Sequence, residues 1–152
     1  MWEENKHPLK ETIMAYASGG LFAIAWWIWI DAATVDAHLE WNTIQPGHYF
    51  PGVFATIALI MVNLVSWTDL DGFGFGDDGS QKRTRFWLFG SFSIMFGALF
   101  AAVWLGIDHW FMKKDVPNSW PGIALILENV IIMCSALMYR FAKTPGDDYM
   151  SL

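Results

Sequence analysis

The sequence predicts an all-α integral membrane protein, a bundle of four transmembrane helices with both termini in the cytosol. Three observations predict this class. The composition is strongly apolar, four apolar segments have the length of a bilayer crossing, and the basic and aromatic residues flank these segments as they do in membrane proteins. The 152 residues are expected to form a single membrane domain, with no soluble domain beside it.

The composition separates this chain from soluble proteins. Hydrophobic residues make up 55% of it and charged residues only 16%, whereas a soluble domain carries about 25% charged residues. Ten tryptophans and twelve phenylalanines add apolar surface that a chain of this length cannot bury internally. The net charge of −6 argues against nucleic-acid binding, and the single cysteine, Cys134, excludes an intramolecular disulfide and a metal site built on cysteines.

The apolar segments define the expected helices. Their lengths of 18 to 22 residues correspond to about 27 to 33 Å of helix, close to a hydrocarbon core of roughly 30 Å. A helix satisfies its own backbone hydrogen bonds in lipid. We therefore predict transmembrane helices at residues 13–30, 49–67, 86–107 and 120–141, a Gly/Asp-rich loop at 68–85 and a short tail at 144–152.

Basic residues predict the orientation of these helices. Seven lysines and arginines lie before the first segment, in the second loop or at the C-terminal end from residue 140 onward, and only two lie in the other loops. Cytosolic loops carry such an excess, so both termini and the loop at 68–85 are predicted to be cytosolic. Within that loop Lys82, Arg83 and Arg85 are expected to contact anionic lipid head groups.

The stretch WWIWIDAA (26–33) lies at the opposite end of the first segment. Tryptophan is enriched at membrane interfaces, so Trp26 and Trp29 are predicted to lie on the lipid surface. At about 100° per residue the three tryptophans cannot share one face, and Trp27 falls on the same stripe as Asp31. We expect Asp31 to lie near water and to cap a neighbouring loop or helix end.

Small and polar residues recur at helical spacing inside the segments. Small residues allow close helix approach in lipid, and polar ones form hydrogen bonds between helices. One interpretation is a bundle that packs only on itself. The other, compatible with the first, is that the stripe on the third segment docks a partner membrane protein. The candidate packing residues are Ser93, Gly97 and Ala101 on the third segment and Thr56 and Asn63 on the second.

Glu128 is the only acid well inside an apolar segment. An ionised carboxylate at that depth costs at least a few kcal/mol, so the side chain should face the interior of the bundle. Thr56 on the second segment and Trp104 on the third lie at a similar depth and are the expected partners, and the deeper Asn63 is a weaker candidate. The favoured role is an anchor between helices, and a proton or cation site is the alternative.

No catalytic, cofactor or metal site is expected. Asp36, His38, Glu40 and His48 lie in the first loop, and acids and imidazoles can bind zinc. Their spacing would place them on one side only in an extended strand, which the sequence does not predict, so a solvated loop is expected. No residues are arranged for nucleophilic catalysis.

Four stretches resemble the transmembrane protein 50 family, which includes the fungal vacuolar protein sorting 68 protein. They are WWIWIDAA, PGVFATIALIMVN, RFWLFGSFSIMFGAL and WPGIALILENV, and they occur in the family's order. The resemblance implies a four-helix protein of endosomal, Golgi or endoplasmic reticulum membranes. It also implies a second integral membrane protein as partner, a tetraspan of the vacuolar protein sorting 55 family.

The residues and the resemblance together predict a non-enzymatic subunit or adaptor in membrane-protein sorting or complex assembly. Its partners would be membrane proteins and lipids. Two alternatives remain open: an accessory subunit of a large membrane complex, and an ion- or proton-conducting component that uses Glu128. The resemblance implies no catalytic activity. It does not support a transport role for Glu128, because glutamine is expected at this position in animal members.

Overall fold

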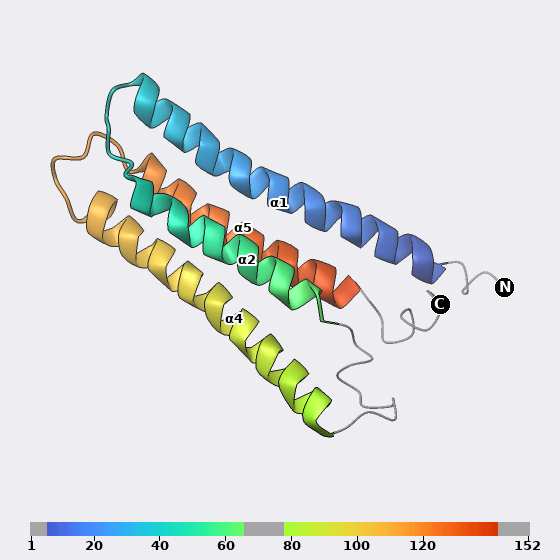
Figure 1. Cartoon of the computed structure of the whole chain (residues 1–152). Helices are drawn as coiled ribbons and strands as arrows, with labels where there is room; N and C mark the ends of the chain where they lie inside the picture. The colour runs from blue at the N-terminus through green and yellow to red at the C-terminus, as the bar shows by residue number, and fades with distance from the viewer. Residues whose placement is uncertain (1–5, 66–77, 143–152) are drawn as a thin grey trace.

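The computed structural model describes residues 6–65 and 78–142, and these form a bundle of helices (Figure 1). Successive long helices run antiparallel, so the first residue of α1 and the last of α5 lie at the same end of the bundle. We call this end the Lys6 end and the opposite one the His38 end. The elements are α1 (Lys6–His38), the 3-10 helix η1 (Pro46–Tyr49), α2 (Phe50–Asn63), α4 (Asp78–Gly106), the π-helix η2 (Ile107–Phe111) and α5 (Trp120–Ala142).

Three of these helices are long and apolar enough to cross a membrane. They contain the spans Leu9–His38, Gln81–Phe111 and Trp120–Ala142. The prediction of four such helices is corrected for α2, which has 14 residues and a length of about 21 Å. Its regular structure ends at Asn63 instead of residue 67, which leaves it shorter than the roughly 20 residues that a crossing requires.

The other helix boundaries extend beyond the apolar segments. α1 has 33 residues and continues through polar positions at both of its ends. α4 begins at Asp78, so the last part of the loop predicted at 68–85 is helical. Hydropathy marks the part of a helix that suits lipid, and the backbone continues the helix into water where nothing stops it. Residues 68–77 and the predicted tail at 144–152 lie outside the described residues.

α5 is the central helix, because α1, α2 and α4 all pack against it. α1 is joined to α5 by a reciprocal pair of serines: Ser18 Oγ lies 3.1 Å from the Ser135 carbonyl, and Ser135 Oγ donates to the Ser18 carbonyl at 2.9 Å. Near the His38 end, glycines allow close packing. A Cβ on Gly122 would lie 3.0 Å from the Trp110 side chain. This packing brings η2 against the start of α5.

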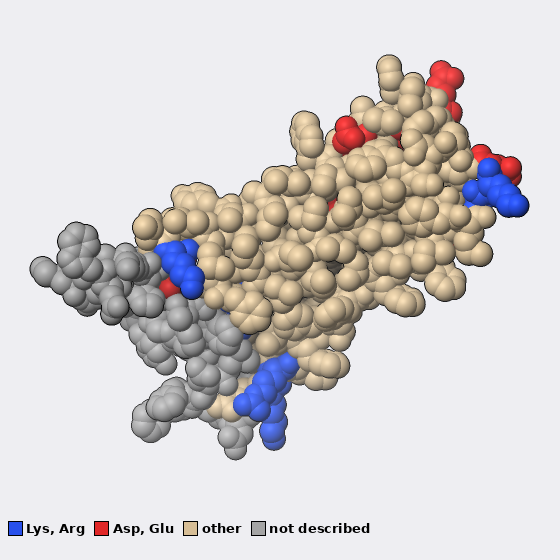
Figure 2. Space-filling view, turned by 180° about the vertical axis from the view of Figure 1, so that it is seen from behind, with Lys and Arg blue, Asp and Glu red and all other residues tan. Residues whose placement is uncertain are grey.

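Charge is confined to the two ends of the bundle, as the face in Figure 2 shows. Its middle is apolar, and large hydrophobic side chains are exposed on every long helix. The described basic residues of the Lys6 end are Lys10, Lys82, Arg83, Arg85 and Arg140. The His38 end has Lys113 and Lys114 together with acids, among them Asp36, Glu40, Asp108 and Asp115.

Candidate functional site

The carboxyl group of Glu128 on α5 is buried inside the bundle, against α2. The side chain is 0% exposed, and neither carboxyl oxygen has a hydrogen-bond partner among the described residues. The group lies directly against the backbone of α2 at Gly52: a Cβ built there would be 2.4 Å from Oε1 and 2.9 Å from Oε2. Glycine at position 52 permits this approach, since a side chain there would overlap the carboxyl group unless Glu128 moved.

A second polar contact joins α1 to α2 one turn further along. The Trp26 indole nitrogen donates to the Thr56 hydroxyl at 3.2 Å, and that hydroxyl donates to the Gly52 carbonyl at 2.8 Å. Gly52 thus contacts both polar groups, through its Cα on one side and its carbonyl on the other. We call Trp26, Gly52, Thr56 and Glu128 the Glu128 site. It is where α1, α2 and α5 meet.

Thr56 was predicted to be the hydrogen-bond partner of Glu128, and the structure corrects this. Its hydroxyl proton goes to the carbonyl of its own helix, an arrangement that threonine commonly adopts inside helices. Close packing against Gly52, not a hydrogen bond, fixes the Glu128 carboxyl group among the described residues. Trp29 Nε1 and Asn129 Oδ1 are also buried without a partner among the described residues. Such groups cost about 1–3 kcal/mol each, so α1 and α5 are packed together at the expense of hydrogen bonding.

A second cluster closes the His38 end and is built around Asp36. This carboxylate accepts hydrogen bonds from the backbone amides of Thr43 and Ile44, at 3.0 and 3.1 Å, and from the Thr43 hydroxyl. Trp110 Nε1 donates to the same hydroxyl at 3.1 Å. Asp36 therefore fixes the loop after α1 and links it to η2. It performs the capping role that the sequence analysis assigned to Asp31, which is exposed on α1.

Two histidines complete this second cluster. His48 is 4% exposed, and its ring lies 4.8 Å from that of His109 and 4.6 Å from that of Trp110, measured between centroids. His48 Nδ1 accepts the Gln45 amide at 2.9 Å, so this nitrogen carries no proton. We call Asp36, Thr43, His48, His109 and Trp110 the Asp36 cluster. The expectation of a solvated loop is therefore wrong for Asp36 and His48.

Hydrogen bonds also fix the proton positions on His109. Its Nε2 lies 2.8 Å from the Thr43 carbonyl, which can only accept, so this nitrogen donates. In the neutral ring Nδ1 is then an acceptor, and Lys113 Nζ lies 3.3 Å from it. The His48 ring is suited to the neutral form, because a proton added to its Nδ1 would face the Gln45 amide.

The pKa of His48 reflects this environment. It is lowered from 6.5 to about 4, first because burial disfavours the imidazolium and then because His109 lies beside it. Lys113 lowers this pKa as well, whereas the Asp36 carboxylate opposes the shift. The folded cluster is therefore stable with His48 neutral, and it resists protonation at pH values where a free histidine accepts a proton.

The possible metal ligands are scattered over the described residues. No three His, Cys, Asp or Glu side chains within residues 6–65 and 78–142 are grouped to hold a metal ion. Cys134 is on the exposed side of α5, away from both clusters. What the two sites share is a structural effect: each joins several helices through polar groups.

The tryptophans of α1 are placed differently from the prediction. Trp29 is fully buried and packs against Leu125 and the ring of Tyr49, 5.4 Å away between centroids. Trp26 is partly buried in the Glu128 site. The prediction that both indoles lie on the lipid surface is therefore wrong for Trp29. Trp27, assigned to the packing stripe, is instead 72% exposed. The correct face could not be chosen because α1 is apolar on all sides.

The remaining predicted residues divide between interior and surface. Asn63 is half-buried and donates to the Leu59 carbonyl of its own helix at 2.8 Å. On α4, Ser93 and Gly97 face outward, and Ala101 is half-buried. Lys82, Arg83 and Arg85 are exposed on the first turns of α4.

Comparison with known proteins identifies the family. A model of the uncharacterised protein family UPF0220 matches residues 2–149. A transmembrane protein 50 homolog from Dictyostelium discoideum is 33% identical over 151 residues, covering 92% of this chain and 97% of the relative. The chain belongs to the UPF0220, or transmembrane protein 50, family. The resemblance drawn from its helix motifs is thereby confirmed.

Two fungal relatives extend the comparison. The UPF0220 protein C8D2.02c of Schizosaccharomyces pombe is 26% identical over 94% of this chain and 87% of its own length. The vacuolar protein sorting-associated protein 68 of Saccharomyces cerevisiae is 26% identical over 88% of this chain and 82% of its own length. No solved structure matches the chain.

The first prediction concerns the contact between Gly52 and Glu128. Gly52→Ala should destabilise the protein by about 1–3 kcal/mol, the usual cost of overpacking, because the new methyl group overlaps the carboxyl group. Thermal unfolding in detergent, followed by tryptophan fluorescence, measures this change. Gly20→Ala is the matched control, since a Cβ there meets no atom within 4 Å. Equal stability of the two variants would contradict the tight contact.

The second prediction concerns the pH dependence of the Asp36 cluster. The unfolded chain binds a proton at His48 below pH 6.5, whereas the folded chain does so only near pH 4. Stability should therefore fall by about 3 kcal/mol as the pH drops through this window.

Thermal unfolding between pH 7 and pH 4 measures this loss. His48→Asn keeps an acceptor for the Gln45 amide but cannot titrate, so its stability should fall less than that of the parent. His38→Asn, at the exposed end of α1, is the control and should leave the slope unchanged. Parallel pH curves for all three proteins would rule out His48 as the source.

Proposed function

We propose that this chain is a non-enzymatic subunit or adaptor that binds another integral membrane protein in endosomal or secretory membrane-protein sorting. The observation that carries the proposal is the outward position of Gly97 on α4. A Cβ there would meet no atom within 4 Å, in contrast to the tightly packed Gly52, Gly106 and Gly122. Gly97 therefore has no packing role in the described fold, and it remains available for close approach by another helix.

The surface around Gly97 suits a helix from a partner. Phe96 and Phe100 are exposed on either side of it, and they would flank a helix seated on the small residue. Gly97 also lines a groove of about 420 Å³ that runs between α4 and the start of α2. It is lined by apolar and small side chains, among them Phe50 and Phe54. The partner we favour is a small multi-pass protein such as a vacuolar protein sorting 55-like tetraspan.

The inner polar groups leave the outer faces as the available contact surfaces. Polar residues at helical spacing on α2 and α5 are a second conceivable contact surface for a partner. Glu128 and Ser135 are buried in the bundle instead, and Thr56 is used in the contact with α1. A partner therefore meets α4 and the exposed hydrophobic side chains.

The relatives support a role in traffic. The yeast relative is named for its association with vacuolar protein sorting, and we extend that association to this chain as part of the proposal. The described basic residues are concentrated at the Lys6 end, which supports placing both termini in the cytosol. Endosomal, Golgi or endoplasmic reticulum membranes are the corresponding location.

The third prediction tests partner binding. The tagged full-length chain, purified in mild detergent, should retain a membrane protein in stoichiometric amount, identified by mass spectrometry. Gly97→Leu should lower its recovery roughly tenfold, equivalent to about 1.4 kcal/mol, because leucine blocks close approach. Gly20→Leu is the control, as Gly20 is equally free of neighbours on α1. Recovery of a lone monomer from the parent chain would overturn the proposal.

One observation favours a second candidate, an ion- or proton-conducting component. It is the burial of Glu128 without a hydrogen-bond partner among the described residues. The fourth prediction separates the two: as an adaptor, the chain in liposomes should give the same proton and cation flux as Glu128→Gln. A flux in the parent that the variant loses would establish the conducting component instead.

A further inference from the structure

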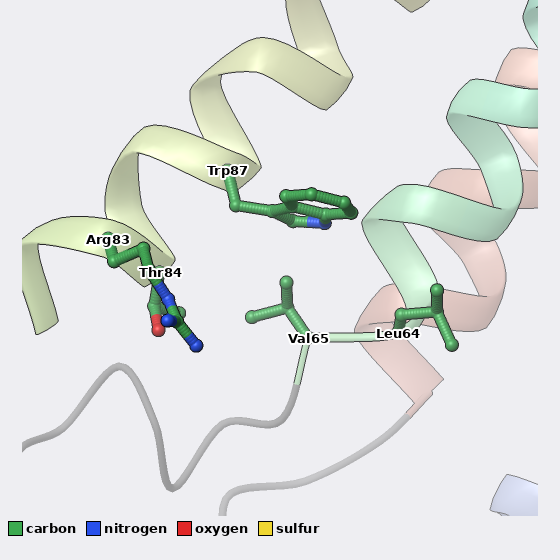
Figure 3. A pocket seen from close by; sticks show the side chains of 5 residues that line it. All are labelled: Leu64, Val65, Arg83, Thr84 and Trp87. Carbon is green, nitrogen blue, oxygen red and sulfur yellow. The ribbon is translucent and has the colours of Figure 1, made fainter. Parts of the chain in front are cut away.

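A cavity of about 460 Å³ opens at the Lys6 end, between the end of α2 and the first turns of α4 (Figure 3). Leu64 and Val65 line it from the α2 side, and Arg83, Thr84 and Trp87 line it from α4. Its size falls within the range of about 300–1,000 Å³ that is typical of small-ligand sites. None of the packing described above uses this space.

The walls of the cavity combine one cation with apolar surface. Trp87 reaches from α4 toward α2, where its indole nitrogen donates to the Met61 carbonyl at 3.1 Å, and this fixes the ring across the cavity (Figure 3). Arg83 lies on the same side one turn earlier. Arg140 of α5 donates to the Val65 carbonyl and so brings a second guanidinium close to this wall. None of the described lining residues is acidic, so these walls favour an anion.

The position of the cavity indicates which kind of anion fits. The apolar segment of α4 begins at Phe86, so Arg83 precedes it by about one turn. Basic residues just outside an apolar span lie near the phosphate groups of phospholipids. Leu64 and Phe86 are largely exposed beside the cavity and offer apolar surface to an acyl chain. A soluble anion would leave this apolar surface uncovered.

We propose that this cavity binds an anionic phospholipid, with Arg83 holding the headgroup phosphate and with Trp87 and Leu64 contacting the upper part of an acyl chain. Guanidinium groups bind phosphate through paired, charge-assisted hydrogen bonds. A zwitterionic headgroup gains less here, because the described lining residues include no carboxylate to hold its ammonium group. The proposal goes beyond partner binding and does not depend on it.

The neighbouring cations Lys82 and Arg85 serve as controls for Arg83. Lys82 and Arg85 are exposed on the same turns of α4 but do not line the cavity. Non-specific attraction to an anionic surface depends on all three charges alike, whereas a built site depends on Arg83. Arg83→Gln and Arg85→Gln are therefore a matched pair with the same change in charge.

The experiment uses the full-length chain in nanodiscs of mixed phosphatidylcholine and phosphatidylserine. After mild detergent extraction, native mass spectrometry counts the lipids that stay bound. The parent should retain phosphatidylserine preferentially, Arg83→Gln should retain roughly tenfold less, and Arg85→Gln should match the parent. Arg83→Lys should be intermediate, because lysine keeps the charge but lacks the planar fork. The thermal midpoints of the variants show that the fold is kept.

Three results would overturn the proposal. Equal losses in Arg83→Gln and Arg85→Gln would indicate surface charge without a site. Unchanged retention in Arg83→Gln would exclude the arginine. Displacement of the bound lipid by millimolar glycerophosphate or inorganic phosphate would assign the site to a soluble phosphate. Retention that persists in their presence and depends on Arg83 supports the lipid.

Discussion

The seating of α2 on α5, where the Gly52 backbone lies against the Glu128 carboxyl group, is the constraint on which the rest of the bundle depends. A carboxyl group without a hydrogen-bond partner is costly inside a low-dielectric bundle, and here the described fold encloses it by close packing. Glycine at position 52 permits that approach. The same residue accepts the Thr56 hydroxyl, through which Trp26 of α1 is held. One close contact thus positions three helices.

This arrangement divides the molecule into parts with different tasks. The polar groups of the interior contact one another or their own helices, so they are not presented to a partner. The outer faces are apolar, and α4 carries the exposed Gly97. The two ends differ as well: the Asp36 cluster closes one end with hydrogen bonds, whereas the other presents cations beside an open cavity. Recognition within the membrane therefore depends on shape, and recognition at the Lys6 end on charge.

Sequence reasoning could predict the helices better than their faces. Composition and segment length predicted the three spanning helices, and the cost of a buried charge placed Glu128 inside. The inward side of α1 could not be predicted, because apolar residues surround the helix and lipid accepts any of them. Trp29, predicted on the lipid surface, is therefore buried, and Trp27, predicted on the packing stripe, is exposed. α2 was predicted too long, because its apolar residues continue beyond the point where the described helix ends.

The Asp36 cluster could not be predicted from the sequence for a different reason. Thr43 and Trp110 are 67 positions apart in the sequence, and a π-helical turn presents Trp110 toward the loop. No local motif marks such a contact. The role of Gly52 is equally non-local, since it is visible only once the carboxyl group opposite is placed. Close approach of backbone to side chain leaves no trace in hydropathy.

The most direct test of this account is a double-mutant cycle between Gly52 and Glu128. It compares the free energies of unfolding of the parent, Gly52→Ala, Glu128→Ala and the double variant in detergent. If the two groups touch, the space left by Glu128→Ala accommodates the new methyl group. The double variant should then be more stable than the sum of the single effects predicts, by more than about 1 kcal/mol. Additivity within about 0.5 kcal/mol would contradict the contact.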